Sequence, residues 1–275
     1  DGRVVCPELH SLLSPALEER IVPYVRARLG DERVVVADAL IRAYRPEDRR
    51  QKLAPHFDVS SFATVIIPLN PGTYEGGLYI QNGASASARL EVDCRRFGSF
   101  EKGDVLCHRY DVMHGVEVSS GSRYSLVLWL ADRQESVEAG TTPWLRGAAE
   151  SGSPYAQFLY AEASRTGTYG VPHDLKVATH FLHSAAAQGH ALSQHQLGMA
   201  YWTGRGVEGK SDAKCLELWG LAADAGLAAA QVDLAKSHRH GYLGLAPNEA
   251  EARRLYLLAA RQGHADAAAI LREWG

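Results

Sequence analysis

The chain has 275 residues, which exceeds the usual size of a single domain, about 100–150 residues, so we expect two domains. Apolar residues make up 46% of the chain and charged residues 22%, a composition that excludes a disordered, coiled-coil or collagen-like protein. The net charge of -3 provides no basic surface, and no apolar run approaches the roughly 18 residues that a membrane span needs. We therefore expect neither nucleic acid nor a membrane as a partner.

The two ends of the chain and its cysteines say little about the compartment. The sequence opens at Asp1, with neither methionine nor a signal peptide, so we expect the native N-terminus to be missing and leave the localisation open. Four scattered cysteines are too few for a disulfide framework. A single bridge between Cys94 and Cys107 stays open as an alternative.

The first half predicts one helix followed by strands. Residues 14–29 predict the helix, with Ser14 as its N-cap, Pro15 in the first turn, a kink at Pro23 and Gly30 at the end. Segments rich in β-branched and aromatic residues, bounded by turn residues, then predict strands. These segments are 34–41, 62–67, 77–80, 105–107 and 124–130. Many short strands separated by Gly and Pro favour a sandwich or a barrel.

The second half repeats itself every 37 residues. An Ala-Ala pair followed by Gly recurs in each unit, beginning at Ala148, Ala185, Ala222 and Ala259. Two further sets keep the same spacing: the glycines Gly167, Gly204 and Gly241, and the N-cap candidates Asp174, Ser211 and Asn248. A period of this length with two helices per unit predicts an α-solenoid, in which each unit stacks on its neighbours.

The clearest copy of this repeat runs from Ala185 to Val207. With its neighbours it resembles the Sel1-like repeats, relatives of the tetratricopeptide repeat, over residues 147–274. The resemblance implies a scaffold that binds a protein partner. The third copy departs from the pattern at its turn, which reads Tyr242-Leu-Gly-Leu-Ala.

Eight of the twelve histidines lie in this second half. His180 and His183 are one helical turn apart, which is a spacing that two metal ligands could use. Because His190 and His264 occupy equivalent repeat positions, we favour a structural or surface role for these histidines.

The candidate chemistry lies in the first half. His56 and Asp58 are two residues apart, so on a strand both side chains would project from one face. His114 could add a third ligand from a distant strand. Two histidines and one carboxylate form the facial triad of non-haem Fe(II) oxygenases, which leaves coordination positions open. Such residues also arise by chance, and a purely structural role stays open at this point.

Arg123 follows His114 by nine residues and begins an apolar segment. On a strand, Arg123 and Ser125 would point inward together. A guanidinium in that place offers a bidentate clamp for a carboxylate. An oxygenase that chelates a 2-oxo acid at iron needs such a clamp for the distal carboxylate.

Three stretches of the first half match a known family: Pro55-His-Phe-Asp-Val-Ser-Ser-Phe62, Leu69-Asn70 with Tyr74-Glu-Gly-Gly77, and His114-Gly-Val with Gly121-Ser-Arg-Tyr-Ser125. With them, residues 31–132 resemble the 2-oxoglutarate- and Fe(II)-dependent dioxygenases, close to the prolyl 4-hydroxylase and procollagen lysyl hydroxylase branch. The resemblance implies a double-stranded β-helix, or jelly roll, with flanking helices. It also implies Fe(II), with 2-oxoglutarate and O2 as cosubstrates and ascorbate as a further candidate.

The same resemblance assigns roles to six residues. The iron ligands would be His56, Asp58 and His114. The distal carboxylate of 2-oxoglutarate would be bound by Arg123 with help from Ser125, and Tyr44 would lie near the cosubstrate. Two positions depart from the family pattern: collagen-type prolyl 4-hydroxylases carry Lys in place of Arg123, and Leu78 follows the glycine pair in place of a polar or small residue.

We therefore predict an α+β multidomain protein. Residues 1–140 would form the jelly-roll dioxygenase domain with its N-terminal helix, and residues 141–275 the α-solenoid of helix-turn-helix repeats. The predicted activity is hydroxylation of a peptidyl prolyl or lysyl side chain, with the repeats recruiting the substrate or a partner. Two alternatives stay open, namely a small-molecule oxygenase of the same chemistry and a solenoid scaffold with an inactive jelly roll.

Overall fold

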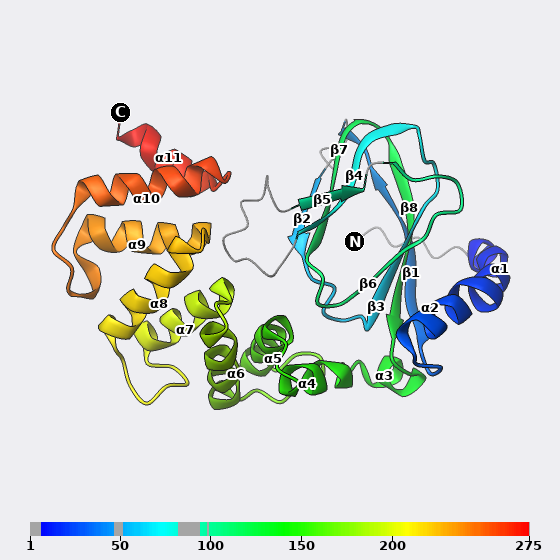
Figure 1. Ribbon diagram of the computed structural model, residues 1–275, viewed down its shortest axis with the longest axis horizontal. Helices are drawn as coiled ribbons and strands as arrows, with labels where there is room; N and C mark the ends of the chain where they lie inside the picture. The colour runs from blue at the N-terminus through cyan, green and yellow to red at the C-terminus, as the bar shows by residue number, and fades with distance from the viewer. Residues whose placement is uncertain (1–6, 47–51, 82–93, 98, 275) are drawn as a thin grey trace. The chain divides into compact units, whose positions relative to one another are not determined.

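The computed structural model describes residues 7–46, 52–81, 94–97 and 99–274 (Figure 1). The chain divides into two compact units. Most of the chain up to Thr142 forms the first unit, whereas Pro143–Gly275 groups with the short segments Tyr79–Arg96 and Asp111–Gly115 in the second. The boundary that the sequence predicts at residue 140 stays a prediction.

The N-terminal helical segment begins earlier than predicted and is interrupted. Helix α1 spans Pro7–Ala16, a π-helical segment spans Leu17–Ile21, and α2 spans Val22–Leu29. Ser14 therefore lies inside α1, and its prediction as an N-cap is wrong. The interruption directly precedes Pro23, which has no N–H to donate and whose ring clashes with the carbonyl four residues before it. Gly30 ends α2 in the left-handed region at φ 68°, as predicted.

The described strands of the first half form two four-stranded sheets (Figure 1). In the first sheet, β8 pairs antiparallel with β1 and β3, and β3 with β6. Its order is β1 (Val35–Tyr44), β8 (Arg123–Ala131), β3 (Ala63–Pro68) and β6 (Leu106–Arg109). The order of the second sheet is β2 (Lys52–His56), β7 (His114–Gly121), β4 (Tyr74–Gln81) and β5 (Cys94–Phe97). Cys107 in β6 is a free thiol, so the bridge that the sequence left open is not formed.

Side chains alternate between the two faces of the first sheet. On one face, Val65 and Leu128 pack against α2 in a buried cluster that includes Val25. On the other face, Ile66 packs against Val116 of the second sheet. The two sheets therefore share a core, an arrangement that is consistent with the predicted jelly roll.

The glycine pair of β4 marks a close approach between strands. Gly76 has a φ of 92°, and a Cβ at this position would overlap the backbone oxygen of Glu117 in β7. Gly76 and Gly77 both lie inside strand β4.

The second half is helical throughout, after the short α3 (Gln134–Ala139). Its helices are α4 (Pro143–Glu150), α5 (Pro154–Thr166), α6 (Leu175–Ala187), α7 (Ala191–Thr203), α8 (Asp212–Asp224), α9 (Ala228–His240), α10 (Glu249–Arg261) and α11 (Ala265–Glu273). The three predicted N-caps hold: the side chains of Asp174, Ser211 and Asn248 each accept a backbone N–H at the start of a helix. The prediction of a helical repeat solenoid is confirmed.

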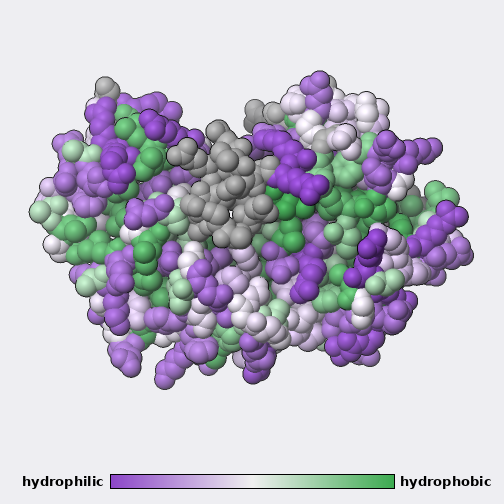
Figure 2. Space-filling model, viewed as in Figure 1, coloured by the Kyte–Doolittle hydropathy of each residue, from purple (hydrophilic) through white to green (hydrophobic). Residues whose placement is uncertain are grey.

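The surface of the helical half mixes hydrophilic and hydrophobic side chains (Figure 2). Trp202 and Tyr242 are among its exposed large apolar residues, while Trp219 is buried beneath Trp202 in an edge-to-face contact. The irregular turn of the third copy forms a 3-10 helix over Tyr242–Gly244 with Leu243 at a φ of 58°. Within the described part of the chain, every helix falls short of the length and apolarity needed to cross a membrane.

A buried glutamine repeats along the solenoid, and one copy lacks a partner. Gln157 and Gln231 each donate to a backbone carbonyl eight residues before and accept from Gln188 and Gln262, respectively, at 2.9 Å. Gln194 makes the same backbone bond to Ala186, but its Oε1 is buried without a hydrogen-bond partner in the described chain. The reason is that Ala225 occupies the position that Gln188 and Gln262 hold in the other copies.

We expect Ala225→Gln to raise the free energy of unfolding by about 1 kcal/mol, because the new amide would donate to the buried Oε1 of Gln194. Ala225 and Gln188 are both C-cap residues, and their backbone angles are similar, with φ of -70° and -87°. The substitution therefore adds no backbone strain. Urea unfolding would measure the change. Ala225→Glu is the matched control, since it has the same length without a donor. Equal stability of the two variants would contradict the explanation.

His190 is the N-cap of α7 and acts through a ring nitrogen. Its Nδ1 accepts from the backbone N–H of Ser193 and lies 2.9 Å from the hydroxyl of that residue. The side chain is buried, and burial lowers the pKa of His190 from its usual 6.5 to about 4. The imidazole is therefore neutral in the folded protein, with its lone pair at the cap.

We expect the solenoid to lose stability as the pH falls from 6.5 to 4. In this window the unfolded chain binds a proton at His190 and the folded chain does not, so acid favours unfolding by up to about 3 kcal/mol. His190→Asn keeps a capping oxygen and removes the titration. Urea unfolding at pH 7, 5.5 and 4.5 should show a steeper loss for the wild type than for this variant, and parallel profiles would refute the assignment.

Candidate metal centre

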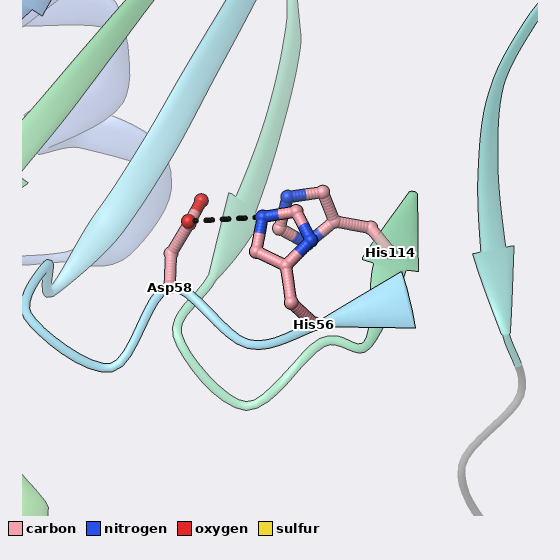
Figure 3. A group of neighbouring side chains, drawn as sticks. All are labelled: His56, Asp58 and His114. Atoms are coloured by element: carbon pink, nitrogen blue, oxygen red, sulfur yellow. Dashed lines mark ion pairs between the residues drawn. The ribbon is translucent and has the colours of Figure 1, made fainter. Parts of the chain in front are cut away.

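Three potential metal ligands meet at one edge of the second sheet. His56 is the last residue of β2, Asp58 lies in the loop that follows, and His114 begins the neighbouring strand β7. Their side chains point toward one another (Figure 3), and the potential ligand atoms all lie within 4.8 Å of one another. The sequence predicted that His56 and Asp58 share a strand face. This is wrong for Asp58, because β2 ends at His56 and the carboxylate approaches from the loop.

The distances within this cluster suit ligands that share an ion. His56 Nε2 lies 3.5 Å from Asp58 Oδ1, which is at the limit of a hydrogen bond. Two ligands bound at right angles to a metal at about 2.1 Å lie about 3 Å apart. The side chain of His56 is 33% exposed and that of Asp58 is 10% exposed, so the cluster opens to solvent on the His56 side.

His114 is held in the tautomer that a metal ligand needs. Its Nδ1 lies 3.1 Å from the backbone oxygen of Val112. A carbonyl oxygen only accepts, so Nδ1 carries the proton and Nε2 presents its lone pair. Metal-binding histidines are commonly held in this way by a bond from their second nitrogen. The ring itself is buried.

A buried cation without an acceptor lies on the first sheet. Arg123 begins β8 and is 1% exposed, with the rings of Tyr44 and Tyr74 centred 5.6 and 5.8 Å from its guanidinium carbon. Its Nε and Nη2 are buried and have no hydrogen-bond partner among the described residues. A guanidinium stays charged, and a buried charge without a partner is costly. The group is therefore prepared for an anion, and its planar fork fits a carboxylate.

Two hydroxyls near this cation are also unsatisfied. Ser125, two residues after Arg123 and on the same face of β8, has a buried Oγ without a partner in the described chain, and so has the hydroxyl of Tyr74. The sequence predicted Arg123, Ser125 and Tyr44 here but gave Tyr74 no role. Asn70 lies in the turn before β4, which carries Tyr74. Its side-chain amide donates to the backbone oxygen of Ser122 and its Oδ1 accepts from the backbone N–H of Tyr124, so this turn is fixed against the start of β8. That contact depends on strand register, which the sequence did not reveal.

The metal cluster and the cation border the same core. His114, Val116 and Val118 alternate along the buried face of β7. Tyr44, which covers the guanidinium of Arg123, packs in one cluster with Val116 and Val118. The core shared by the two sheets is thus bordered by potential metal ligands and by a cation whose Nε and Nη2 find no acceptor among the described residues.

Comparison with known families identifies the helical half. Residues 154–190, 191–227 and 228–264 match the Sel1 repeat family, so the chain carries three Sel1 repeats in the 37-residue register. A comparison with curated proteins finds no match.

Several solved structures resemble part of the chain. A Sel1 repeat protein from Oxalobacter formigenes is 29% identical over 45% of this chain and 35% of its own, with a TM-score of 0.42. A protective antigen of uropathogenic Escherichia coli with an SLR fold is 30% identical over 50% of this chain and 28% of its own, with a TM-score of 0.43. This chain thus spans well under two thirds of either protein. An oxidoreductase of the 2OG-Fe(II) oxygenase family from Burkholderia pseudomallei is 17% identical over 47% of this chain and 59% of its own, with a TM-score of 0.38.

Proposed function

We propose that the protein is an Fe(II)- and 2-oxoglutarate-dependent oxygenase whose Sel1 repeats bind a protein substrate or partner. The observation that carries the proposal is the buried guanidinium of Arg123. Its Nε and Nη2, like the hydroxyls of Ser125 and Tyr74, have no hydrogen-bond partner among the residues that the structure describes. A ligand with a chelating 2-oxo acid at one end and a carboxylate at the other would satisfy both this group and the His-Asp-His cluster.

Each residue has a defined part in this proposal. His56, Asp58 and His114 would hold Fe(II) through two imidazoles and one carboxylate, a donor set that suits this metal and leaves positions open. Fe(II) held there would supply the oxidative chemistry by which 2-oxoglutarate and O2 give succinate and CO2 while a C–H bond is hydroxylated. Arg123 receives the distal carboxylate of the cosubstrate in a bidentate pair.

The remaining residues shape the cosubstrate site. The hydroxyls of Ser125 and Tyr74 would donate to the same carboxylate, which gives each buried group the partner it lacks. The rings of Tyr44 and Tyr74 flank the guanidinium and keep water from it. Excluded water makes the charge pair stronger than it would be at the surface.

The proposed substrate is a peptidyl prolyl or lysyl side chain, which the sequence resemblance supports, with ascorbate as a candidate reductant. A solenoid presents a broad surface suited to protein ligands. The exposed Trp202 and Tyr242 supply aromatic side chains of the kind that protein interfaces favour.

The proposal is tested with purified protein, Fe(II) and 2-oxoglutarate without oxygen. We expect a weak visible charge-transfer band, and on admitting oxygen we expect succinate, which NMR would detect. The matched control is 2-oxobutyrate, which has the chelating end but no distal carboxylate and should bind much more weakly. Equal affinity for the two acids, or no band, would refute the proposal. A peptide library read by mass spectrometry for a gain of one oxygen would then identify the substrate.

A further inference from the structure

The two oxygens of the Asp58 carboxylate face different neighbours. Asp58 Oδ2 lies 2.6 Å from the hydroxyl of Thr64, whereas Oδ1 lies 3.5 Å from Nε2 of His56. Oδ1 therefore faces the imidazole with which it would share a metal. Oδ2 faces the first sheet, where the side chain of Thr64 is fully buried.

The direction of the Thr64 bond follows from its partners. An ionised carboxylate only accepts, so the single hydroxyl proton of Thr64 is donated to Asp58 Oδ2. The 2.6 Å separation is typical of a hydroxyl bound to a carboxylate. Ser61, also fully buried, lies 3.0 Å from both Thr64 Oγ1 and the backbone oxygen of Asp58. Ser61 thus ties the hydroxyl of Thr64 to the loop that carries the ligand.

The sheet fixes the position of this donor. Thr64 lies on β3 between Ala63 and Val65, which pack in the cluster on the helical face, so its side chain points inward. Across the ladder it pairs with His108 of β6, whose Nε2 lies 4.0 Å from Asp58 Oδ2. Asp58 lies in the loop after β2, outside the strand ladders that contain His56 and His114. The first sheet orients its carboxylate through Thr64.

We propose that Thr64 is a positioning residue of the metal centre, which holds Oδ2 of Asp58 so that the carboxylate binds the metal through Oδ1 alone. The inference rests on the proposed function, since it takes the cluster to be a metal centre. Binding through one oxygen limits the three protein ligands to three positions on the metal. The other positions then stay open for the cosubstrate and O2.

Cobalt(II) binding to the full chain tests this role, because its visible absorption reports both affinity and coordination number. Thr64→Val keeps the shape of the side chain and removes the donor, and we expect it to raise the dissociation constant for Co(II) roughly 10–100-fold. Its spectrum should also change, because the released Oδ2 becomes available as a second carboxylate ligand. Thr64→Ser restores the donor, and its affinity and spectrum should be close to wild type.

The control is Thr179→Val in the repeats. Thr179 is also a buried threonine, and its hydroxyl donates to the backbone oxygen of Gly206 at 2.7 Å, so its loss costs stability without touching the metal centre. It should leave Co(II) binding unchanged. Thr64→Ala, which cannot clash, repeats the measurement should the valine disturb folding. Wild-type Co(II) affinity and spectrum in Thr64→Val and Thr64→Ala would overturn the inference, while a wild type that binds no Co(II) would overturn the proposed function itself.

Discussion

Replacing His114 by alanine is expected to abolish both Fe(II) binding and the release of succinate from 2-oxoglutarate. Only His56 and Asp58 would remain, and two donors from one short segment cannot hold the ion in a fixed geometry. The strand pairing of β7 is made by backbone groups and not by the imidazole of His114, so we expect its removal to leave that pairing intact. Iron content by mass spectrometry and succinate by NMR measure the two effects, and circular dichroism reports the fold.

His180→Ala is the matched control for this variant. His180 is an exposed histidine of α6 whose ring makes an edge-to-face contact with Phe181, so its removal should affect neither iron content nor turnover. His56→Ala should behave as His114→Ala does, because both imidazoles belong to the same cluster. Turnover retained in either ligand variant would show that the iron ligands have been misassigned.

Replacing Arg123 by methionine is expected to weaken 2-oxoglutarate binding and yet to keep or raise the stability of the free protein. A charge-assisted hydrogen bond is worth about 1.5–3 kcal/mol, so losing the bidentate pair should raise the dissociation constant at least about tenfold. The free protein gains because methionine replaces a buried charge whose Nε and Nη2 lack partners in the described chain. Titration calorimetry and urea unfolding measure the two opposite changes.

Two comparisons make this result specific. Arg123→Lys keeps the charge but not the planar fork, so its affinity for 2-oxoglutarate should fall between wild type and Arg123→Met. Added 2-oxoglutarate should stabilise the wild type against urea much more than Arg123→Met, because a ligand stabilises only the state that binds it. A methionine variant that binds 2-oxoglutarate as the wild type does would exclude Arg123 from the site.

Much of the fold could be predicted because its signals are local. The repeat is visible because the same cap and turn residues return every 37 positions, and Asp174, Ser211 and Asn248 do cap helices. The strands β2, β5 and β7 escaped prediction. They contain Pro55, paired arginines and flanking glycines, respectively, so pairing with neighbours, and not propensity, makes them strands.

The sequence could indicate the types of residue in the candidate site, but not the neighbours that strand pairing gives them. The spacing of His56, Asp58 and His114 also arises by chance, so it was the family resemblance that selected them, together with Arg123, from the sequence. Tyr74 and Thr64 are ordinary residues whose significance lies in what they face. Tyr74 of the second sheet covers Arg123 of the first, and Thr64 at the start of β3 reaches back to Asp58 in the preceding loop. A one-dimensional pattern carries no information on such neighbours until the strand pairing is known.

The alternation of side chains along β3 links the N-terminal helices to the proposed metal centre on the opposite face of the sheet. Ala63 and Val65 are anchored against the helices on one face, and Thr64 reaches Asp58 from the other. A slip of β3 by a single residue would exchange the two faces, presenting an aliphatic side chain to the carboxylate and a hydroxyl to the apolar cluster. The apolar contacts of α2 therefore fix the alignment of β3, and through it the contact between Thr64 and Asp58 at the proposed metal centre.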